Sequence, residues 1–216
     1  MAKLKTAVLI SGRGSNLQAL IDYCQSENSR AQISLVISNV KGAAGLEKAT
    51  EAGIISEVIE HNLFKNRNSF ENALTETLDG YGIEFICLAG FMRILTDAFV
   101  KRWHNKIINI HPSLLPSFKG LKTHERALQE GVKFTGCTVH FVREEMDTGP
   151  IIVQAAVPIL SDDDPKSLEH RVLLAEHRCY PLALNLIAEN RVTIINEKVS
   201  IPNSKAPGVF FSNPIE

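Results

Sequence analysis

The sequence lacks the features of several broad classes of protein. Its four cysteines are scattered, without a Cys-x-x-Cys pair or the spacing of zinc ligands. No apolar stretch approaches the roughly 20 residues that a membrane-spanning helix needs. The first 15 residues also lack the pattern of a signal peptide. We therefore expect a cytoplasmic protein with reduced thiols and no membrane segment.

Neither sign of charge is in excess, because 23 Lys and Arg residues face 24 Asp and Glu residues. This balance gives no long-range attraction toward nucleic acid or an anionic membrane, so we expect neither as a partner. Any anion must then be bound by a local site. The 216 residues are 44% hydrophobic and show no repeat or linker, which indicates one domain with a real core.

What the sequence does contain is a regular alternation of short apolar runs and helical patterns. Strands are expected over residues 6–10, 33–38, 54–59, 85–88 and 107–110, and helices over 16–25, 45–52, 67–81 and 96–103. This order favours an α/β fold with a doubly wound, mostly parallel sheet.

The second half of the chain has a different pattern. Two apolar runs, 135–142 and 151–159, flank a loop and are expected to form paired strands that give the sheet a mixed C-terminal edge. A long helix is expected over 168–190, with a kink at Pro181. Residues 192–199 are interpreted as an added strand, and the polar tail after Pro202 as irregular.

The first motif that carries chemistry is Ser-Gly-Arg-Gly-Ser-Asn at 11–16, between the first strand and the first helix. Free backbone N–H groups at a helix start attract phosphate, and glycines let the backbone come close to it. The motif is neither G-x-G-x-x-G nor a P-loop, which favours a single phosphate monoester over a dinucleotide or nucleoside triphosphate. On its own, an ordinary tight turn explains it equally well.

The second motif is Asn109-Ile110-His111-Pro112 at the end of a buried strand. Side chains two residues apart on a strand point to the same side, and ligands of α/β sheets bind at the carboxyl ends of the strands. An amide beside an imidazole can stabilise an oxyanion and transfer a proton. Taken alone, a histidine in this position is more often structural.

The third motif is Met146-Asp147-Thr148-Gly149-Pro150, in the loop between the two late strands. This loop would bring the Asp147 carboxylate toward His111 and favour the protonated imidazole. Read alone, Asp147 is better explained as the first residue of a turn.

Taken together, six collinear segments resemble the folate-dependent phosphoribosylglycinamide formyltransferases of purine synthesis. They are VLISGRGSNLQ at 8–18, F-x-x-R-x-x-F at 64–70, LAGFMRIL at 88–95, NIHPSLLPSFKG at 109–120, HFV-x-x-x-MDTGPII at 140–152 and RVLLAEHRCYP at 171–181. The set Asn109, His111 and Asp147 is typical of the formyltransferase superfamily. The glycine-rich loop is typical of the branch of that superfamily that acts on glycinamide ribonucleotide.

The resemblance implies a formyltransferase-like variant of the Rossmann fold, forming one domain over 1–216. Its half 1–105 would bind the phosphoribosyl group, and its half 106–216 would bind folate and carry the catalytic residues. The reaction would transfer the formyl group of 10-formyltetrahydrofolate to the amine of 5'-phosphoribosylglycinamide, without a metal ion. The protein would be a monomer or a homodimer with only these small molecules as partners.

The resemblance also assigns roles to individual residues. Asn109, His111 and Asp147 would be catalytic. The residues expected to bind phosphoribosylglycinamide are Gly14, Ser15, Asn16 and Glu176. The residues expected to bind folate are Arg67, Met92, Arg93, Ile94, Leu95, Asn109, Arg143, Glu144, Glu145, Met146 and Asp147. Asn68 departs from the family pattern, which has an acidic residue after the arginine.

Three other functions are compatible with parts of this pattern. A hydrolase of 10-formyltetrahydrofolate would carry a regulatory domain before the first strand, and we expect none here. A transferase acting on initiator methionyl-tRNA would need a further C-terminal domain and a basic face. A non-catalytic phosphosugar-binding domain would not need a centre that handles protons, although the fold alone does not prove activity.

Overall fold

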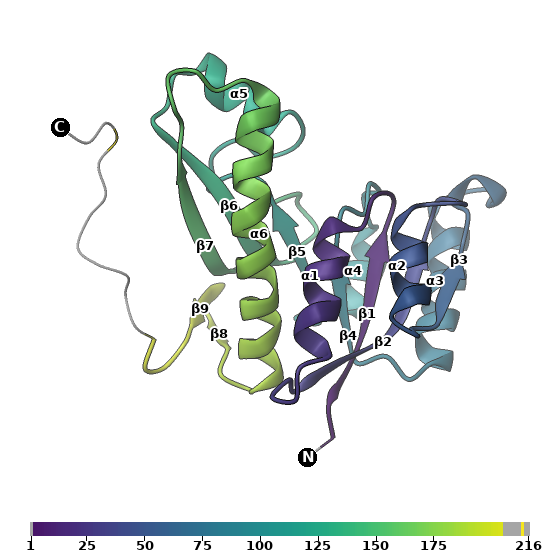
Figure 1. Ribbon diagram of the computed structural model, residues 1–216. Helices are drawn as coiled ribbons and strands as arrows, with labels where there is room; N and C mark the ends of the chain where they lie inside the picture. Colours follow the sequence, from purple (N-terminus) through teal and green to yellow (C-terminus); the bar gives the residue numbers. More distant parts are fainter. Residues whose placement is uncertain (1, 205–212, 214–216) are drawn as a thin grey trace.

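The computed structural model describes residues 2–204 and 213, and its centre is a seven-stranded sheet with the order β3-β2-β1-β4-β5-β6-β7 (Figure 1). The strands are β1 (Leu4–Ile10), β2 (Ala31–Ser38), β3 (Ser56–Val58), β4 (Phe85–Leu88), β5 (Ile107–His111), β6 (Phe134–Phe141) and β7 (Ile151–Pro158). The first five strands pair in parallel, whereas β6 is antiparallel to both β5 and β7. The predicted doubly wound sheet with a mixed C-terminal edge is confirmed.

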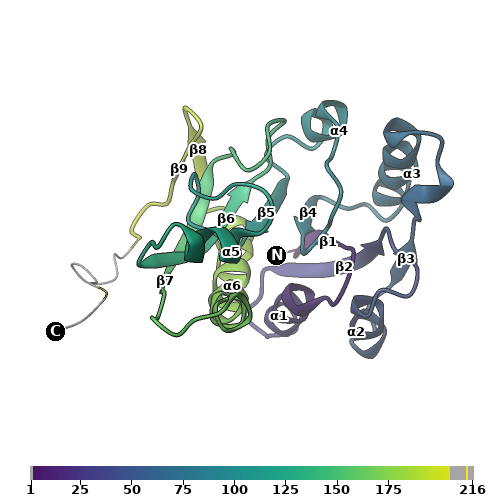
Figure 2. The same ribbon diagram turned by 90° about the horizontal axis from the view of Figure 1, so that it is seen from above.

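Helices cover both faces of the sheet, as Figure 2 shows along the molecule. On one face lie α1 (Ser15–Cys24), α2 (Gly45–Glu51) and α6 (Pro165–Ala188), and on the other lie α3 (Arg67–Gly80) and α4 (Asp97–Arg102). None of the helices in the described part of the chain is long and apolar enough to cross a membrane.

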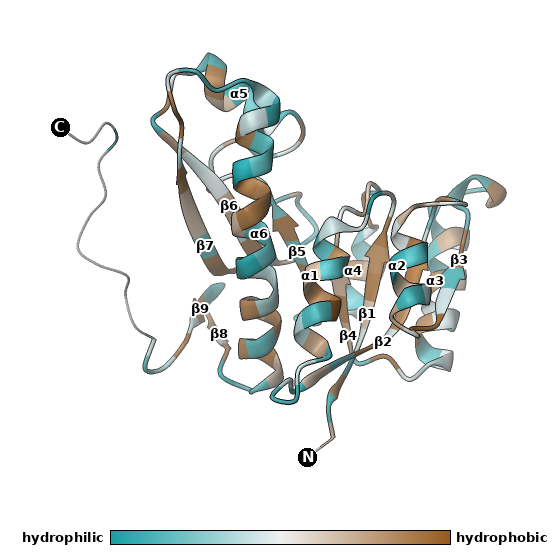
Figure 3. Ribbon diagram, viewed as in Figure 1, coloured by the Kyte–Doolittle hydropathy of each residue, from teal (hydrophilic) through white to brown (hydrophobic). Residues whose placement is uncertain are grey.

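The central strands are buried on both faces, which explains their continuous apolar runs. In β1, Val8 and Ile10 join the core beneath α1 and α6, whereas Ala7 and Leu9 join the core beneath α3 and α4. The brown strands in the middle of Figure 3 correspond to this doubly buried layer. The sheet is therefore a rigid support for the loops at its carboxyl edge.

The helix α6 begins earlier than residue 168, because Asp164 and Ser167 form a capping box and Pro165 is the first helical residue. It continues through Pro181 to Ala188. A further helix, α5 (Thr123–Gln129), follows the proline-rich loop after β5 and was not predicted. A short 3₁₀ helix, η1 (His61–Leu63), lies before α3.

The prediction of one added strand over 192–199 is wrong. This segment forms a separate hairpin of β8 (Thr193–Ile195) and β9 (Lys198–Ser200), outside the main sheet. The chain reverses at Asn196 and Glu197, which both have left-handed backbone angles, as the turn of a two-residue hairpin requires. The tail beyond residue 204, predicted to be irregular, lies outside the described residues apart from residue 213.

Candidate active site

The carboxyl end of β5 places Asn109 and His111 on the sheet face opposite α6. Ile108 and Ile110, which alternate with them, pack into the core beneath α6. In the antiparallel pair of β5 and β6, Asn109 lies directly opposite His140, so both side chains project from the same face. The two catalytic candidates predicted from β5 are thus joined by a histidine from β6.

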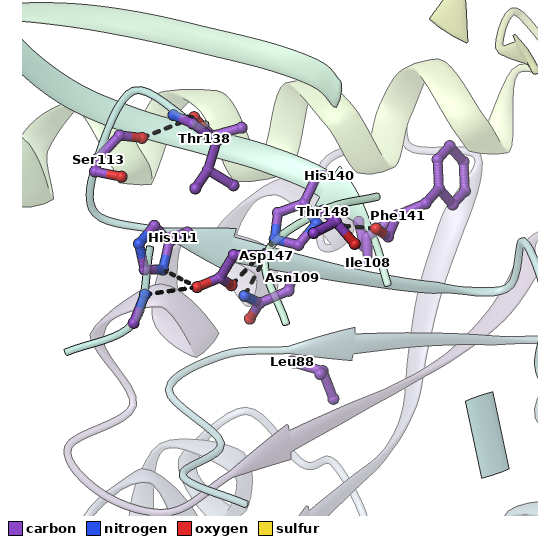
Figure 4. Close-up of polar contacts among 12 residues, drawn as sticks. Leu88, Ile108, Asn109, His111, Ser113, Thr138, His140, Phe141, Asp147 and Thr148 are labelled. Atoms are coloured by element: carbon purple, nitrogen blue, oxygen red, sulfur yellow. Dashed lines mark hydrogen bonds and ion pairs between the residues drawn. The ribbon is translucent and has the colours of Figure 1, made fainter. Parts of the chain in front are cut away.

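The Asp147 loop, residues 142–150, connects β6 to β7 and folds back over this face (Figure 4). Gly149 lies so close to β6 that a Cβ atom there would be 1.7 Å from the carbonyl oxygen of Phe141. Asp147 has a left-handed backbone with φ of 56°, a conformation that aspartate tolerates better than most residues. The Asp-Thr-Gly sequence therefore turns the carboxylate inward.

The Asp147 carboxylate is the hub of the site. Its Oδ2 atom accepts a hydrogen bond of 2.9 Å from the backbone N–H of Gly120 and lies 3.4 Å from Nδ1 of His111. Its Oδ1 atom lies 3.8 Å from Nε2 of His140. The Asp147 and His111 side chains are only 7% and 8% exposed, so water screens their interaction weakly. The structure brings the three predicted catalytic residues together.

The imidazole of His111 is held between two acceptors. Its Nε2 donates to the carbonyl oxygen of Phe118 over 3.0 Å, while Nδ1 faces Asp147. The bond to Phe118 uses the Nε2 proton, and any proton on Nδ1 would point toward the Asp147 carboxylate.

His140 is the functional candidate that sequence reasoning missed. Its Nδ1 donates to the carbonyl oxygen of Phe141 over 2.9 Å, and burial, opposed by that bond and by Asp147, lowers the pKa of the ring. A neutral ring with its proton on Nδ1 leaves Nε2 as an acceptor for the amide of Asn109, 3.4 Å away. His140 thus orients Asn109. Its role became visible from its register opposite Asn109. In the sequence, its one signal was its position as the first residue of the family-like segment 140–152.

We expect His140→Ala to lower kcat by about tenfold to a hundredfold, because the Asn109 amide loses the acceptor that sets its orientation. His140→Gln, which offers a carbonyl acceptor in the same region, should recover part of the loss. Steady-state kinetics and the melting temperature of each variant test this. Equal losses in both variants, in proportion to their loss of stability, would leave His140 with a packing role only.

A second cluster lies where β1 meets α1. Gly14 has φ of 70°, and a Cβ atom there would be 2.7 Å from the Cα of Gly45, so only glycine fits. Gly14 precedes α1, which begins at Ser15 and leaves N–H groups of its first turn free. The Asn16 Nδ2 atom donates to Glu176 of α6 over 2.7 Å. The structure joins the four residues predicted to bind phosphoribosylglycinamide.

The pair of Asn16 and Glu176 is buried and incompletely satisfied. The Oδ1 atom of Asn16 is buried without a hydrogen-bond partner among the described residues. Burial raises the pKa of Glu176 from 4.5 to about 6, against the opposing effect of the Asn16 amide. Such an environment is typical of a binding site rather than of a stabilising contact.

Glu176→Gln is expected to stabilise the fold at neutral pH. A carboxyl whose pKa is raised on folding favours the native state only while it is protonated, and this contribution is lost as the pH rises through about 6. The lost contribution is about 2 kcal/mol. Denaturant unfolding at pH 4.5 and pH 7.5 should therefore show the variant gaining about that much relative to wild type at the higher pH. An unchanged difference between the two pH values would contradict this.

The residues predicted to bind folate fall into two groups. Arg67, Arg93 and Ile94 line a hollow of about 380 Å³ between α3 and the segment that follows β4. Met92 beside them is 70% exposed, whereas Leu95 is 7% exposed and belongs to the core beneath α3 and α4. The first group therefore forms one wall of a cleft with cationic and apolar parts.

The second group lies on the Asp147 loop. The Arg143 guanidinium is already used, because it donates to Glu197 over 2.6 Å and to Asn105 over 2.8 Å. The side chains of the next three residues are exposed, and they are Glu144, Glu145 and Met146. The structure thus places Arg143 as an anchor for the loop. In residues 2–204 and 213, no three His, Cys, Asp or Glu side chains are grouped so as to hold a metal ion.

Comparison with known proteins agrees with this geometry. The formyl transferase family matches residues 4–184. A phosphoribosylglycinamide formyltransferase of Escherichia coli (strain K12) is 40% identical over 204 residues, covering 94% of this chain and 96% of the relative. The crystal structure of glycinamide ribonucleotide transformylase 1 from Symbiobacterium toebii has a TM-score of 0.90 at 45% identity, covering 92% of this chain and 94% of that one.

This chain belongs to the formyl transferase family. The relatedness extends to the trifunctional purine biosynthetic protein adenosine-3 of Homo sapiens, which is 55% identical over 192 residues. That match covers 89% of this chain and only 19% of the human protein, so the chain spans about a fifth of that relative. The sequence resemblance and the formyltransferase fold are confirmed.

Proposed function

We propose that this formyltransferase transfers the formyl group of 10-formyltetrahydrofolate to the amine of 5'-phosphoribosylglycinamide, in the cytoplasm and within purine synthesis. The observation that carries the proposal is the buried cluster of Asn109, His111 and Asp147 at the sheet edge. Each of the two other clusters has the chemistry to bind one substrate. The loop before α1 suits a phosphate, and the cleft of Arg67 and Arg93 suits the anionic tail of a folate.

The chemistry begins with attack of the glycinamide amine on the formyl carbon. The carbonyl bond opens to a tetrahedral intermediate with a negative oxygen. Asn109 has one amide hydrogen left after donating to His140, and this hydrogen is the first donor to the oxyanion. His111 is the second donor. Its 3.4 Å contact with Asp147 is longer than the roughly 2.7–2.9 Å of a tight charge-assisted bond, so its Nδ1 proton can be shared with the oxyanion.

Breakdown of the intermediate moves one proton between the two nitrogens. The attacking nitrogen loses a proton, which Asp147 accepts directly or through a water molecule. The bond from the formyl carbon to the folate nitrogen then breaks, and that nitrogen takes a proton from His111 or the same water. The carbonyl reforms, and the charges of His111 and Asp147 are restored. No covalent link to the protein is needed.

A spectrophotometric assay with a 10-formyl folate analogue tests the proposal. Loss of the formyl group only in the presence of phosphoribosylglycinamide is expected, together with formation of the formylated nucleotide. Loss at the same rate without the nucleotide would identify a hydrolase instead. Binding of both ligands without turnover would identify a binding domain and overturn the proposal.

A further inference from the structure

Arg13 has an unusual position for a cationic side chain. It lies between the two glycines of the loop that joins β1 to α1, directly before the proposed phosphate residues. Its side chain is 84% exposed, and among the described residues its one polar partner is Glu169 of α6, at 2.8 Å. The function proposed above gives this guanidinium no role.

The face of α6 that looks toward this loop carries two carboxylates. Glu169 precedes Glu176 by seven residues, or two helical turns, so both lie on one side of α6. Glu176 binds Asn16, and Glu169 binds Arg13. Burial and, to a smaller extent, the charge of Glu169 raise the pKa of Glu176. A phosphate dianion at this loop would therefore meet negative charge from α6.

A cation at the loop would offset this repulsion. Lys48 of α2 passes one side, with its Cδ atom 3.4 Å from the position of a Cβ on Gly14. Arg13 stands in the loop itself, and an exposed ion pair such as Arg13 with Glu169 contributes little to stability. The guanidinium can therefore leave Glu169 for a phosphate, whose oxygens it can bind as a bidentate donor.

We propose that Arg13 is a phosphate ligand that Glu169 holds in place until the nucleotide binds. The inference rests on the proposed function and adds a residue that selects phosphorylated over unphosphorylated substrate. Glu169 competes with the substrate phosphate for the same guanidinium. Removing Arg13 should therefore weaken nucleotide binding, whereas removing Glu169 should strengthen it.

The test compares Arg13→Gln with Glu169→Gln. Arg13→Gln should raise the KM for phosphoribosylglycinamide about tenfold with kcat nearly unchanged, because one charge-assisted contact is lost. Glu169→Gln should lower that KM about two- to fivefold, because the competing carboxylate is gone. Arg102→Gln breaks another exposed pair, with Asp79 on the other sheet face, and should change neither constant.

A second substrate separates binding of the phosphate from stability of the loop. With glycinamide riboside, which lacks the phosphate, wild type and Arg13→Gln should have the same kcat/KM. A loss that persists with the riboside, or a rise in KM in both variants, would assign the pair a structural role and overturn the proposal. So would an unchanged KM in Arg13→Gln.

The proposed function can fail separately, if wild type shows no turnover that depends on the nucleotide. Calorimetric titration with ribose 5-phosphate then tests Arg13 directly. Binding that is about tenfold weaker in Arg13→Gln than in wild type and Arg102→Gln would support the phosphate ligand. Equal affinity in all three would overturn it.

Discussion

Asp147→Asn is expected to lower kcat about 10²- to 10³-fold while changing the KM of either substrate only a few-fold. The substitution preserves shape, and the asparagine carbonyl can still accept from the backbone N–H of Gly120. What disappears is the negative charge beside His111. The imidazole then has no anionic partner to hold its orientation, and the attacking amine has no carboxylate to receive its proton.

The substitution also has a second effect, because the N–H groups of the new amide would face Nε2 of His140. That nitrogen is the acceptor for Asn109, so the two amides would compete for it. Steady-state kinetics with both substrates varied measures the effect, and circular dichroism checks that the fold is retained. Asp79→Asn, the same change at an exposed ion pair on α3, is the matched control and should leave kcat and KM unchanged. A kcat within threefold of wild type would remove Asp147 from the chemical step.

The order of strands and helices could be predicted because strands and helices have different patterns of apolar residues. Doubly buried strands such as β1 give continuous apolar runs, and amphipathic helices such as α3 repeat every three to four residues. The hairpin of β8 and β9 was not readable in this way. The three residues on each side of the Asn-Glu turn look like one strand until two successive left-handed residues reverse the chain.

Two of the three residues predicted to be catalytic share one strand, which made their common direction visible in the sequence. Period-two geometry placed Asn109 and His111 on one side of β5, but the family resemblance was needed to assign them, together with Asp147, to the reaction. His140 belongs to the same site by the register of an antiparallel pair, which many side chains along both strands set together. Without that register, a buried histidine in a late strand looks like a core residue.

The phosphate end shows a similar limit. The glycine loop was visible locally, but its contact between Asn16 and Glu176 joins residues 160 positions apart. The sequence could assign Glu176 to this end only through the family resemblance. The role of Arg143 was likewise hidden, because Glu197 and Asn105, which engage its guanidinium, approach from distant segments.

Asn109→Ala is expected to lower kcat by a similar factor, about 10²- to 10³-fold, because one of the two donors to the oxyanion is removed. The alanine loses the half-buried amide without changing β5, whose backbone pairs with β4 and β6 on either side. KM should change little, since the hydrogen bond forms mainly in the transition state. Steady-state kinetics with each substrate varied while the other is saturating separates the effect on kcat from the effect on KM. A raised KM at unchanged kcat would make Asn109 a binding residue instead.

The double variant Asn109→Ala/His140→Ala decides how the two residues act together. If His140 acts only by orienting the Asn109 amide, removing His140 has no further effect in a protein that already lacks this amide. The double variant should then have the same kcat as Asn109→Ala. Additive losses would show that His140 contributes to the reaction on its own, for instance by shuttling the proton near Asp147. The two outcomes differ by the full effect of His140→Ala, about tenfold or more, which kinetics resolves readily. Because His140 is buried and neutral beside a carboxylate, non-additivity is the result that its lowered pKa and its Nδ1 bond to Phe141 support.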